Sequence, residues 1–379
     1  MQNGGPDGDG DEEKYAEIWI GTHPNAPSTV GGCGTLLDMI EKDPAFHLGE
    51  QHSTANIPFL LKLLSIEKVL SIQSHPDLIL AAELHAKNPT VYKDACHKPE
   101  MAIALTDFTA MCGFRPLREI VGNLTTYPEL QDIVSPASVV GIKAAYEKTK
   151  GLVDFDQSTN KALKELFSSF MANFDANPQP LAACITRLTT KPSPTPLDEL
   201  LLSFSRQFPG DCGVFSPLFL AVHHLTPGQS LFVPANTPHA YITGEIIECM
   251  ARSDNVIRCG LTPKFKDVEV LCDSLAYDTT QQVPSEGVLG AEGRLYRPPV
   301  SDFEVRVNEV EKDSAVTIDG GVDSGSVLLV LEGEGKVKSG EESVDVGRGE
   351  SLYVSANSPL VLEGGGEGLK VVRAMRNLK

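Results

Sequence analysis

The segment Pro227-Gly-Gln-Ser-Leu-Phe-Val-Pro-Ala-Asn-Thr-Pro238 returns near the end of the chain as Arg348-Gly-Glu-Ser-Leu-Tyr-Val-Ser-Ala-Asn-Ser-Pro359. In both copies a Gly turn leads into a short apolar strand and then into an Asn-x-Pro bend, so the sequence predicts one supersecondary unit used twice. The next residue is His239 in the first copy and Leu360 in the second. Only the first copy therefore retains a side chain that can bind a metal.

The composition indicates a soluble, cytoplasmic protein of more than one domain. A chain of 379 residues exceeds what one core usually fills, so we expect two or three domains. Its eight cysteines form no Cys-x-x-Cys pair, which argues against a disulfide framework and a thiolate zinc knuckle and favours a reducing compartment. No stretch approaches the roughly 20 apolar residues of a membrane span.

The charge of the chain restricts its partners. A net charge of −19 disfavours binding to nucleic acid or to an anionic membrane, since both rely on clustered Lys and Arg. An anionic small molecule would have to meet a local basic group. Such a group follows His239 and consists of Arg252, Arg258, Lys264 and Lys266, although solvated surface charges would give the same pattern.

The pattern along the chain predicts a mainly β protein with a helical insert. Apolar residues recur at three- and four-residue intervals in Ala137–Lys150 and Asn160–Phe174, whereas short β-type runs dominate before and after this block. We expect five segments: a disordered acidic tail over 1–14, the first part of a catalytic β domain over 15–106, a helical domain over 107–211, the second part of the catalytic domain over 212–285, and a C-terminal, metal-free β domain over 286–379. A loop near 280–294 should separate the two β domains.

Four residues form a candidate metal site. Gln73 and His75 lie two apart on a predicted strand, so both side chains leave the same face. Pro99 fixes the backbone before Glu100, and His239 adds a second imidazole. Two imidazoles, a carboxylate and an amide oxygen suit zinc or another divalent transition metal and leave positions open for water or substrate. Taken singly, each spacing also fits ordinary buried polar residues.

Several motifs in order give the chain a resemblance to a known family. They are Tyr15-Ala-Glu, Gly21-Thr-His-Pro24, Leu70-Ser-Ile-Gln-Ser-His-Pro-Asp77, Lys98-Pro-Glu-Met101, Pro234-Ala-Asn-Thr-Pro-His-Ala-Tyr241 and Asp254-Asn-Val-Ile-Arg-Cys-Gly-Leu-Thr-Pro-Lys264. With these motifs the chain resembles the type I phosphomannose isomerases (mannose-6-phosphate isomerases), which are zinc enzymes of the cupin superfamily. The resemblance implies a bicupin: a catalytic cupin domain, a helical domain, and a metal-free C-terminal cupin-like domain.

The resemblance also implies an activity and the residues that carry it. The activity is the zinc-dependent interconversion of mannose 6-phosphate and fructose 6-phosphate, which feeds GDP-mannose synthesis and mannosylation, by a cytoplasmic protein that we expect to be a monomer with one Zn²⁺ per chain. The family's zinc ligands fall on Gln73, His75, Glu100 and His239, and its active-site arginine falls on Arg258. Positions that look like its substrate-pocket residues are Ser71, Lys98, Glu248 and Lys264.

The chemistry suggests roles for these positions. A proton must move between C2 and C1 of the open-chain sugar through an enediolate, and the metal and Arg258 would stabilise the negative charge on oxygen. Glu248 is the candidate base, because partial burial in the barrel would raise its pKa. The alternative is that Glu248 is a surface or salt-bridged carboxylate, with Lys98 or a water on the metal as the base. Lys264, with Lys98 as a second candidate, would meet the phosphate.

One departure from the family's pattern leaves other functions open. Chains of this kind normally begin with a further strand-forming segment that contains a Trp-Gly pair, whereas here the region reads Gly-Gly-Pro-Asp-Gly-Asp-Gly-Asp. The first alternative is therefore an N-terminally shortened, catalytically weak or inactive sugar-phosphate-binding cupin. A cupin with oxygen chemistry would typically use several histidines and one glutamate around iron, and a storage or scaffold role would not explain why only one copy lost its histidine.

Overall fold

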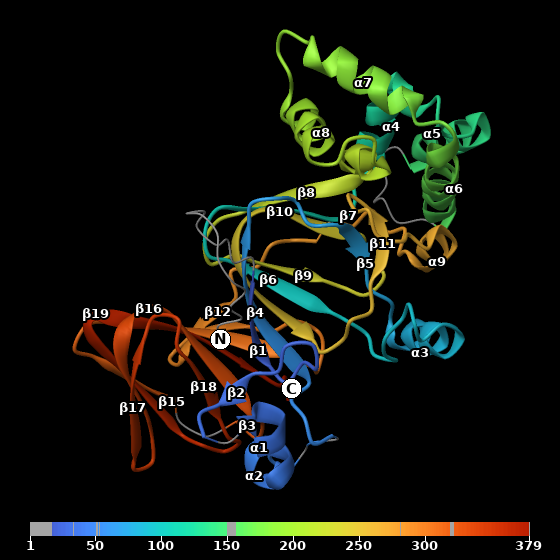
Figure 1. Ribbon diagram of the computed structural model, residues 1–379. Helices are drawn as coiled ribbons and strands as arrows, with labels where there is room; N and C mark the ends of the chain where they lie inside the picture. The colour runs from blue at the N-terminus through green and yellow to red at the C-terminus, as the bar shows by residue number, and fades with distance from the viewer. Residues whose placement is uncertain are drawn as a thin grey trace, which may run out of the picture.

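The computed structural model describes residues 17–32, 34–50, 52, 54–149, 157–280, 282–318 and 322–378. The acidic tail expected over 1–14 lies outside these ranges. Figure 1 shows a helical block at the top, a β domain in the middle and a second β domain at the lower left. The predicted fold class, two β domains with a helical insert, is confirmed.

The first β domain is a nine-stranded sheet built from two separate parts of the chain. Its strands are β1 (Glu17–Gly21), β4 (Phe59–Ile66), β5 (Ile72–Ser74), β6 (Glu100–Ala104), β7 (Phe108–Phe114), β8 (Leu220–Leu225), β9 (Ser230–Val233), β10 (His239–Ala251) and β11 (Ile257–Gly260). The main path runs β1-β4-β10-β5-β11; β6 joins β10 to β9, and β7 joins β10 to β8. Below this sheet in Figure 1 lie a two-stranded sheet, β2 (Thr29–Val30) with β3 (Gly34–Thr35), and two short helices, α1 (Leu36–Lys42) and α2 (Pro44–Leu48).

Strand β10 organises the first β domain because it pairs with four other strands. Its first residues pair with β5 and β7, and its later residues pair with β4 and β6. Between the two halves Gly244 adopts φ +116°, and a Cβ there would lie 2.6 Å from the carbonyl oxygen of Asp107. Only glycine fits this close approach. The bend lets one strand present His239 near its start and Glu248 near its end.

The helical block contains α4 (Leu117–Thr126), α5 (Pro136–Thr149), α6 (Gln157–Asn173), α7 (Gln179–Thr189) and α8 (Pro196–Gln207), with short 3₁₀ helices η1 (Pro128–Leu130), η2 (Phe174–Ala176) and η3 (Cys212–Leu218). The predicted start of this block at residue 107 is wrong. Residues 108–114 form β7, which pairs with β10 and β8, so the helices begin at Leu117. The predicted proline break falls between α7 and α8, where Thr195 and Asp198 form a capping box around Pro196.

Two further helices, α3 (Leu78–Lys87) and α9 (Val268–Ser274), lie beside the first β domain at the right of Figure 1. The second β domain is an eight-stranded sheet of β12 (Val288–Gly290), β13 (Gly293–Tyr296), β14 (Glu304–Val310), β15 (Ala315–Ile318), β16 (Ser326–Ser339), β17 (Glu342–Gly347), β18 (Ser351–Val354) and β19 (Leu360–Met375). The loop predicted over 280–294 is shorter than expected, because β12 and β13 form a hairpin that starts at Val288.

The repeated sequence forms the same structure in both β domains. Strand β9 pairs with β6 in the first copy, and β18 pairs with β16 in the second. The bend that follows has a left-handed asparagine in each copy, with φ 60° at Asn236 and φ 57° at Asn357. Asparagine tolerates this backbone better than most residues, so the shared Ala-Asn step explains the shared bend.

Separate apolar clusters support these parts. One fills the helical block and packs it onto the first sheet, and one fills the inside of each β domain. A further cluster joins the two β domains, with Phe59 and Leu61 of β4 packed against residues that include Phe303 and Val305. Strand β4 therefore packs on both faces, which explains why apolar residues occupy adjacent positions along it.

Candidate metal centre

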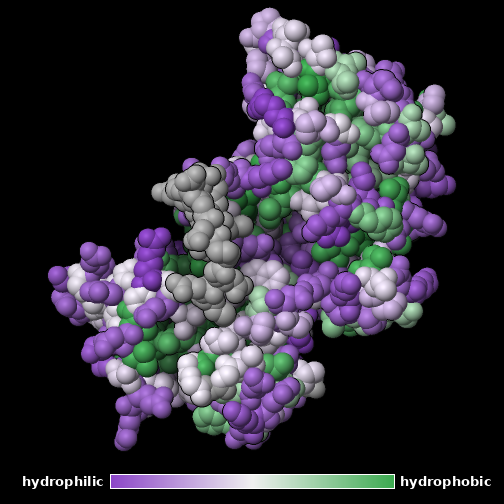
Figure 2. Space-filling model, in the orientation of Figure 1, coloured by the Kyte–Doolittle hydropathy of each residue, from purple (hydrophilic) through white to green (hydrophobic). Residues whose placement is uncertain are grey.

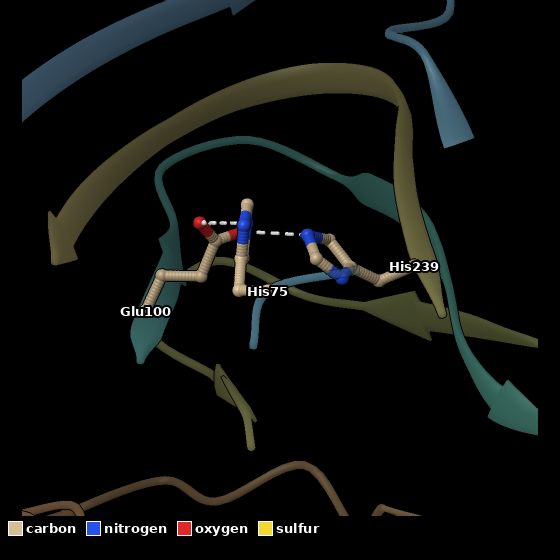
Figure 3. Close-up of side chains that lie close together, drawn as sticks. All are labelled: His75, Glu100 and His239. Atoms are coloured by element: carbon tan, nitrogen blue, oxygen red, sulfur yellow. Dashed lines mark ion pairs between the residues drawn. The ribbon is translucent and has the colours of Figure 1, made fainter. Parts of the chain in front are cut away.

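Three side chains from three strands of the first β domain converge in its interior. In Figure 3 dashed lines join the carboxylate of Glu100, at the start of β6, to His75, which follows β5, and to His239, which begins β10. The Nε2 atom of His75 lies 3.1 Å from Glu100 Oε2, and the Nε2 atom of His239 lies 2.9 Å from Glu100 Oε1. All three side chains are 1% exposed, and one ligand atom from each lies within 4.8 Å of the others.

The outer nitrogen of each imidazole is fixed by a backbone carbonyl. His75 Nδ1 lies 2.7 Å from the oxygen of Asn255, and His239 Nδ1 lies 2.9 Å from the oxygen of Thr237. A carbonyl only accepts hydrogen bonds, so the neutral form of each ring carries its proton on Nδ1. Each Nε2 lone pair then faces a carboxylate oxygen, and these two acceptors repel unless a cation lies between them.

The buried polar atoms of the site fit such a cation. Within the described ranges, His75 Nε2, His239 Nε2 and Glu100 Oε2 have no hydrogen-bond partner. Buried polar atoms are normally paired, so three orphaned acceptors at one point indicate an ion. Imidazole nitrogen and carboxylate oxygen are typical zinc ligands, and three protein ligands are the number found in catalytic zinc sites. The site suits one zinc ion.

Electrostatics favour the ligand forms of these groups. Burial lowers the pKa of His75 to about 4, and Lys98 acts in the same direction, so its imidazole is neutral at pH 7. Burial alone would raise the pKa of Glu100, but His239, His75 and Lys98 outweigh it and hold that pKa well below the usual value. A neutral imidazole beside an ionised carboxylate is the state that binds a metal.

Gln73 lies next to the metal centre in the sheet. It pairs with His239 on β10 and with Arg258 on β11, so it separates the two predicted functional residues. Its backbone position therefore agrees with the predicted site, while the role of its amide as a fourth ligand stays a prediction. Arg258 is half-buried, and burial lowers the pKa of its guanidinium.

Two residues reach Glu100 from the side, one predicted and one missed. Lys98 Nζ lies 3.7 Å from Glu100 Oε2 and is largely buried. Tyr241 Oη donates a hydrogen bond of 3.0 Å to Glu100 Oε1, and burial raises the pKa of this phenol, so it stays a neutral donor. The sequence could have indicated Tyr241, because it lies two residues after His239 and residues two apart on a strand share one face.

The predicted base, Glu248, is buried and has a cationic partner. Burial raises its pKa even though Lys62 Nζ lies 3.2 Å from its Oε2. The surface half of the alternative is therefore wrong, whereas its other half, a salt-bridged carboxylate, agrees with the ion pair to Lys62, so the role of Glu248 as base stays a prediction. Lys62 was missed by sequence reasoning, although it was the one charged residue in the run FLLKLLSI. Its ammonium also lies 4.5 Å from the centre of the Trp19 ring.

Polar contacts behind His75 also escaped the sequence analysis. Asn255, whose carbonyl oxygen orients His75, is held by hydrogen bonds from its Nδ2 to the backbone oxygens of Asp94 and Cys96 at 2.7 and 2.9 Å. Next to it, His23 Nε2 lies 3.2 Å from Asp254 Oδ1. The motif Asp254-Asn-Val-Ile-Arg258 was the available signal, but only its arginine was assigned a role.

Two predicted substrate residues lie outside these contacts. Ser71 precedes β5 and is partly exposed, and Lys264 is exposed on the loop after β11. In the described part of the chain, neither side chain forms a hydrogen bond or ion pair with the metal-site residues. Exposure is compatible with contact to a soluble ligand, so both roles stay predictions.

Together, the two cupin-like β domains and the buried His-Glu-His group define a metal-binding protein of the cupin type. Residues 4–117 match the family model of the type I phosphomannose isomerase catalytic domain, and residues 139–220 match that of its helical insertion domain. The chain is 40% identical to the mannose-6-phosphate isomerase of Ogataea parapolymorpha, over 93% of this chain and 86% of the relative. It is 37% identical to that of Saccharomyces cerevisiae, over 96% of this chain and 89% of the relative.

Solved structures agree with this relationship. The structure described as mannose 6-phosphate isomerase (holo; zinc bound) superposes with a TM-score of 0.80 at 30% identity, covering 96% of this chain and 91% of that chain. A single-residue variant of the phosphomannose isomerase from Salmonella typhimurium superposes with a TM-score of 0.82 at the same identity and coverage. The chain belongs to the type I phosphomannose isomerases, so the predicted family is confirmed.

The hydropathy of the surface and of the helices bears on contact with membranes. In the view of Figure 2 most of the surface is hydrophilic, and apolar areas are scattered over the helical block and the second β domain. No helix in the described part of the chain has the length and apolar character needed to cross a membrane.

Proposed function

We propose that this chain interconverts mannose 6-phosphate and fructose 6-phosphate by moving a proton between C2 and C1 of the open-chain sugar. The observation that carries the proposal is the orphaned His75-Glu100-His239 group with a second buried carboxylate, Glu248, in the same barrel. Isomerases of this reaction need stabilisation of an oxyanion and a base of suitable pKa. Both needs are met within one interior.

The first need concerns the charge on oxygen. Zinc held by His75, Glu100 and His239, with Gln73 as fourth ligand, would supply Lewis-acid stabilisation of the oxyanion. Arg258 lies beside Gln73 in the sheet and adds a permanent positive charge on the same side. Tyr241 and Lys98 hold Glu100 in place from the side.

The second need concerns the proton. Glu248 accepts it, because burial raises the pKa of this carboxylate towards the operating pH while Lys62 keeps enough of it ionised. Lys62 also orients the carboxylate through the 3.2 Å contact. Lys264, which is exposed on the loop after β11, and Lys98 bind the phosphate. In the cell the product would serve GDP-mannose synthesis.

The decisive assay is conversion of mannose 6-phosphate to fructose 6-phosphate by the purified protein before chelation, after chelation and after zinc is restored. We expect zinc-dependent turnover that is lost in His239→Ala. His224→Ala is the matched control, since His224 is an exposed imidazole of the same sheet whose Nδ1 lies 3.1 Å from the Thr109 hydroxyl. Folded, zinc-loaded protein without turnover would instead support the binding-only alternative.

A second assay separates proton transfer from a hydride shift. A hydride shift would carry a C2 deuterium to C1 intact, whereas proton transfer through Glu248 exchanges part of the label with solvent. We expect progressive loss of deuterium when a C2-deuterated sugar turns over in light water. Complete retention of label at C1 after many turnovers would rule out the proton-transfer mechanism.

A further inference from the structure

The second β domain repeats the geometry of the metal centre with different residues. In the first domain Glu100 lies opposite Val233 of β9 and Met250 of β10. In the second domain Ser326 lies opposite Val354 of β18 and Met375 of β19. Ser326 therefore occupies the place of Glu100.

The neighbouring positions correspond in the same way. Glu248 precedes Met250 by two residues and lies opposite Lys62 of β4. Arg373 precedes Met375 by two residues and lies opposite Arg306 of β14. Arg373 thus stands where the first domain has Glu248, and Arg306 stands where it has Lys62.

This correspondence reverses the charge of the site. The first domain places two carboxylates and one ammonium at these positions, whereas the second places a hydroxyl and two guanidinium groups. His239 is replaced by Leu360, so a principal metal ligand is also lost. This end of the second domain is suited to an anion rather than to a cation.

The positive charge is not fully balanced by protein carboxylates. Arg306 Nη1 pairs with Glu292, and Arg297 pairs with Glu304 at 2.5 Å. Arg373 has no ion pair within the described ranges, and its Nε donates a hydrogen bond of 2.9 Å to the neutral Ser326 Oγ. Three guanidinium groups therefore face two carboxylates.

Burial makes this imbalance costly. Arg373 is only 2% exposed, and burial together with Arg306 lowers the pKa of its guanidinium to about 10. Arg306 Nε is likewise buried with no hydrogen-bond partner among the described residues. Like charges on directly opposite strand positions are destabilising, and an unpaired buried charge costs far more than a paired one. Something that binds both arginines would offset this cost.

We propose that Arg373 and Arg306 of the second β domain bind the phosphate group of a small molecule. A planar guanidinium donates two parallel hydrogen bonds to a tetrahedral oxyanion, and Ser326 offers a hydroxyl at the same point. Glu304 in this group is 7% exposed, whereas Arg297 and Glu292 are about a third exposed, so the group is partly open to solvent, which suits a compact ligand. The occupant is inorganic phosphate or a sugar phosphate, and the proposal does not depend on the reaction assigned to the first domain.

The direct test is diffraction from crystals of the zinc-loaded protein grown without phosphate and soaked in selenate, whose selenium gives an anomalous signal. We expect an anomalous peak in contact with the Arg373 and Arg306 guanidinium groups. A peak at the first domain's sugar-phosphate site alone, in the same crystals, would overturn the proposal, because it shows that the soak succeeded and that the second domain did not bind.

Titration in solution tests the same site with the whole protein. The unfolding temperature is followed against inorganic phosphate in the wild type, in Arg373→Met and in Arg348→Met, which removes an exposed arginine of the same domain. We expect saturable stabilisation with an apparent affinity about tenfold to a hundredfold weaker in Arg373→Met and unchanged in Arg348→Met. Equal phosphate responses in all three proteins would refute the proposal.

Two further arms remove ambiguity. If Arg373 has a purely structural role, Arg373→Met is less stable than the wild type without phosphate, whereas an uncompensated charge predicts equal or higher stability. Should Arg373→Met fail to fold, Arg306→Met takes its place with the same expected loss. If mannose 6-phosphate raises the unfolding temperature with the same dependence on the arginines, the occupant is a sugar phosphate. If only inorganic phosphate does so, the occupant is the free ion. A rise with chloride alone contradicts both.

Discussion

Tyr241→Phe isolates one hydrogen bond of the metal centre. The change removes the Oη that donates to Glu100 Oε1 at 3.0 Å and leaves the aromatic ring, which is 4% exposed, in its packing against Phe108. A hydrogen bond to a charged group contributes about 1.5 to 3 kcal/mol. Because the bond acts on a metal ligand, we expect zinc affinity to fall about tenfold to a hundredfold.

Zinc affinity is measured by competition with a chelator at pH 7, and turnover is measured with saturating zinc. The matched control is Tyr353→Phe, which removes a 2.9 Å hydrogen bond from Tyr353 Oη to the backbone oxygen of His47 in the other β domain. We expect the control to bind zinc as the wild type does. If Tyr241→Phe retains wild-type affinity, or if both variants lose affinity equally, the positioning role assigned to Tyr241 is wrong.

Three other predictions test the charge and packing of the first domain. In Lys62→Met the buried Glu248 loses its cationic partner, so the pKa of the Glu248 carboxyl rises further. We then expect turnover to fall roughly a hundredfold and the acid limb of the pH–rate profile to move to higher pH. An unmoved acid limb would contradict the assignment of Glu248 as base. The pKa of His75 is about 4 in the folded protein against 6.5 when unfolded, so the unfolded state binds the proton more tightly. Zinc-free protein should therefore lose about 3 kcal/mol of stability as the pH falls from 6.5 to 4, as measured by denaturant unfolding. His75→Gln should make that loss smaller. Phe167→Ala should lower the free energy of unfolding by about 3 to 5 kcal/mol, because its fully buried ring packs on Phe114 and on other aromatic rings; a loss below 1 kcal/mol would show that the cavity collapses.

The sequence predicted the parts of the fold that are encoded locally. The Asn236 and Asn357 bends, the proline break before α8 and the helices α5 and α6 depend on residues close together in the chain. The false start of the helical block at 107 has a non-local cause. Residues 108–114 become a strand because β10 and β8, far along the chain, provide hydrogen bonds on both sides.

The candidate site follows the same division. His75, Glu100 and His239 could be found because each lies in a short motif, and metal ligation explains their residue types. Lys62 could not be assigned, since a lysine in an apolar run also fits a side chain that reaches the surface. Its ion pair with Glu248 depends on the pairing of β4 with β10, which brings the two side chains within 3.2 Å.

The two β domains show that backbone geometry and chemistry are encoded by different residues. Both keep the Gly turn and the left-handed Asn of the repeat, so both hold the same backbone positions at the same end of the sheet. At those positions Glu100 corresponds to Ser326 and Glu248 to Arg373, which exchanges a cation site for a surplus of buried positive charge. A decayed metal site that had lost all function would be expected to fill with apolar side chains, because these carry no desolvation cost. The second domain instead buries Arg373, and a bound anion accounts for that choice.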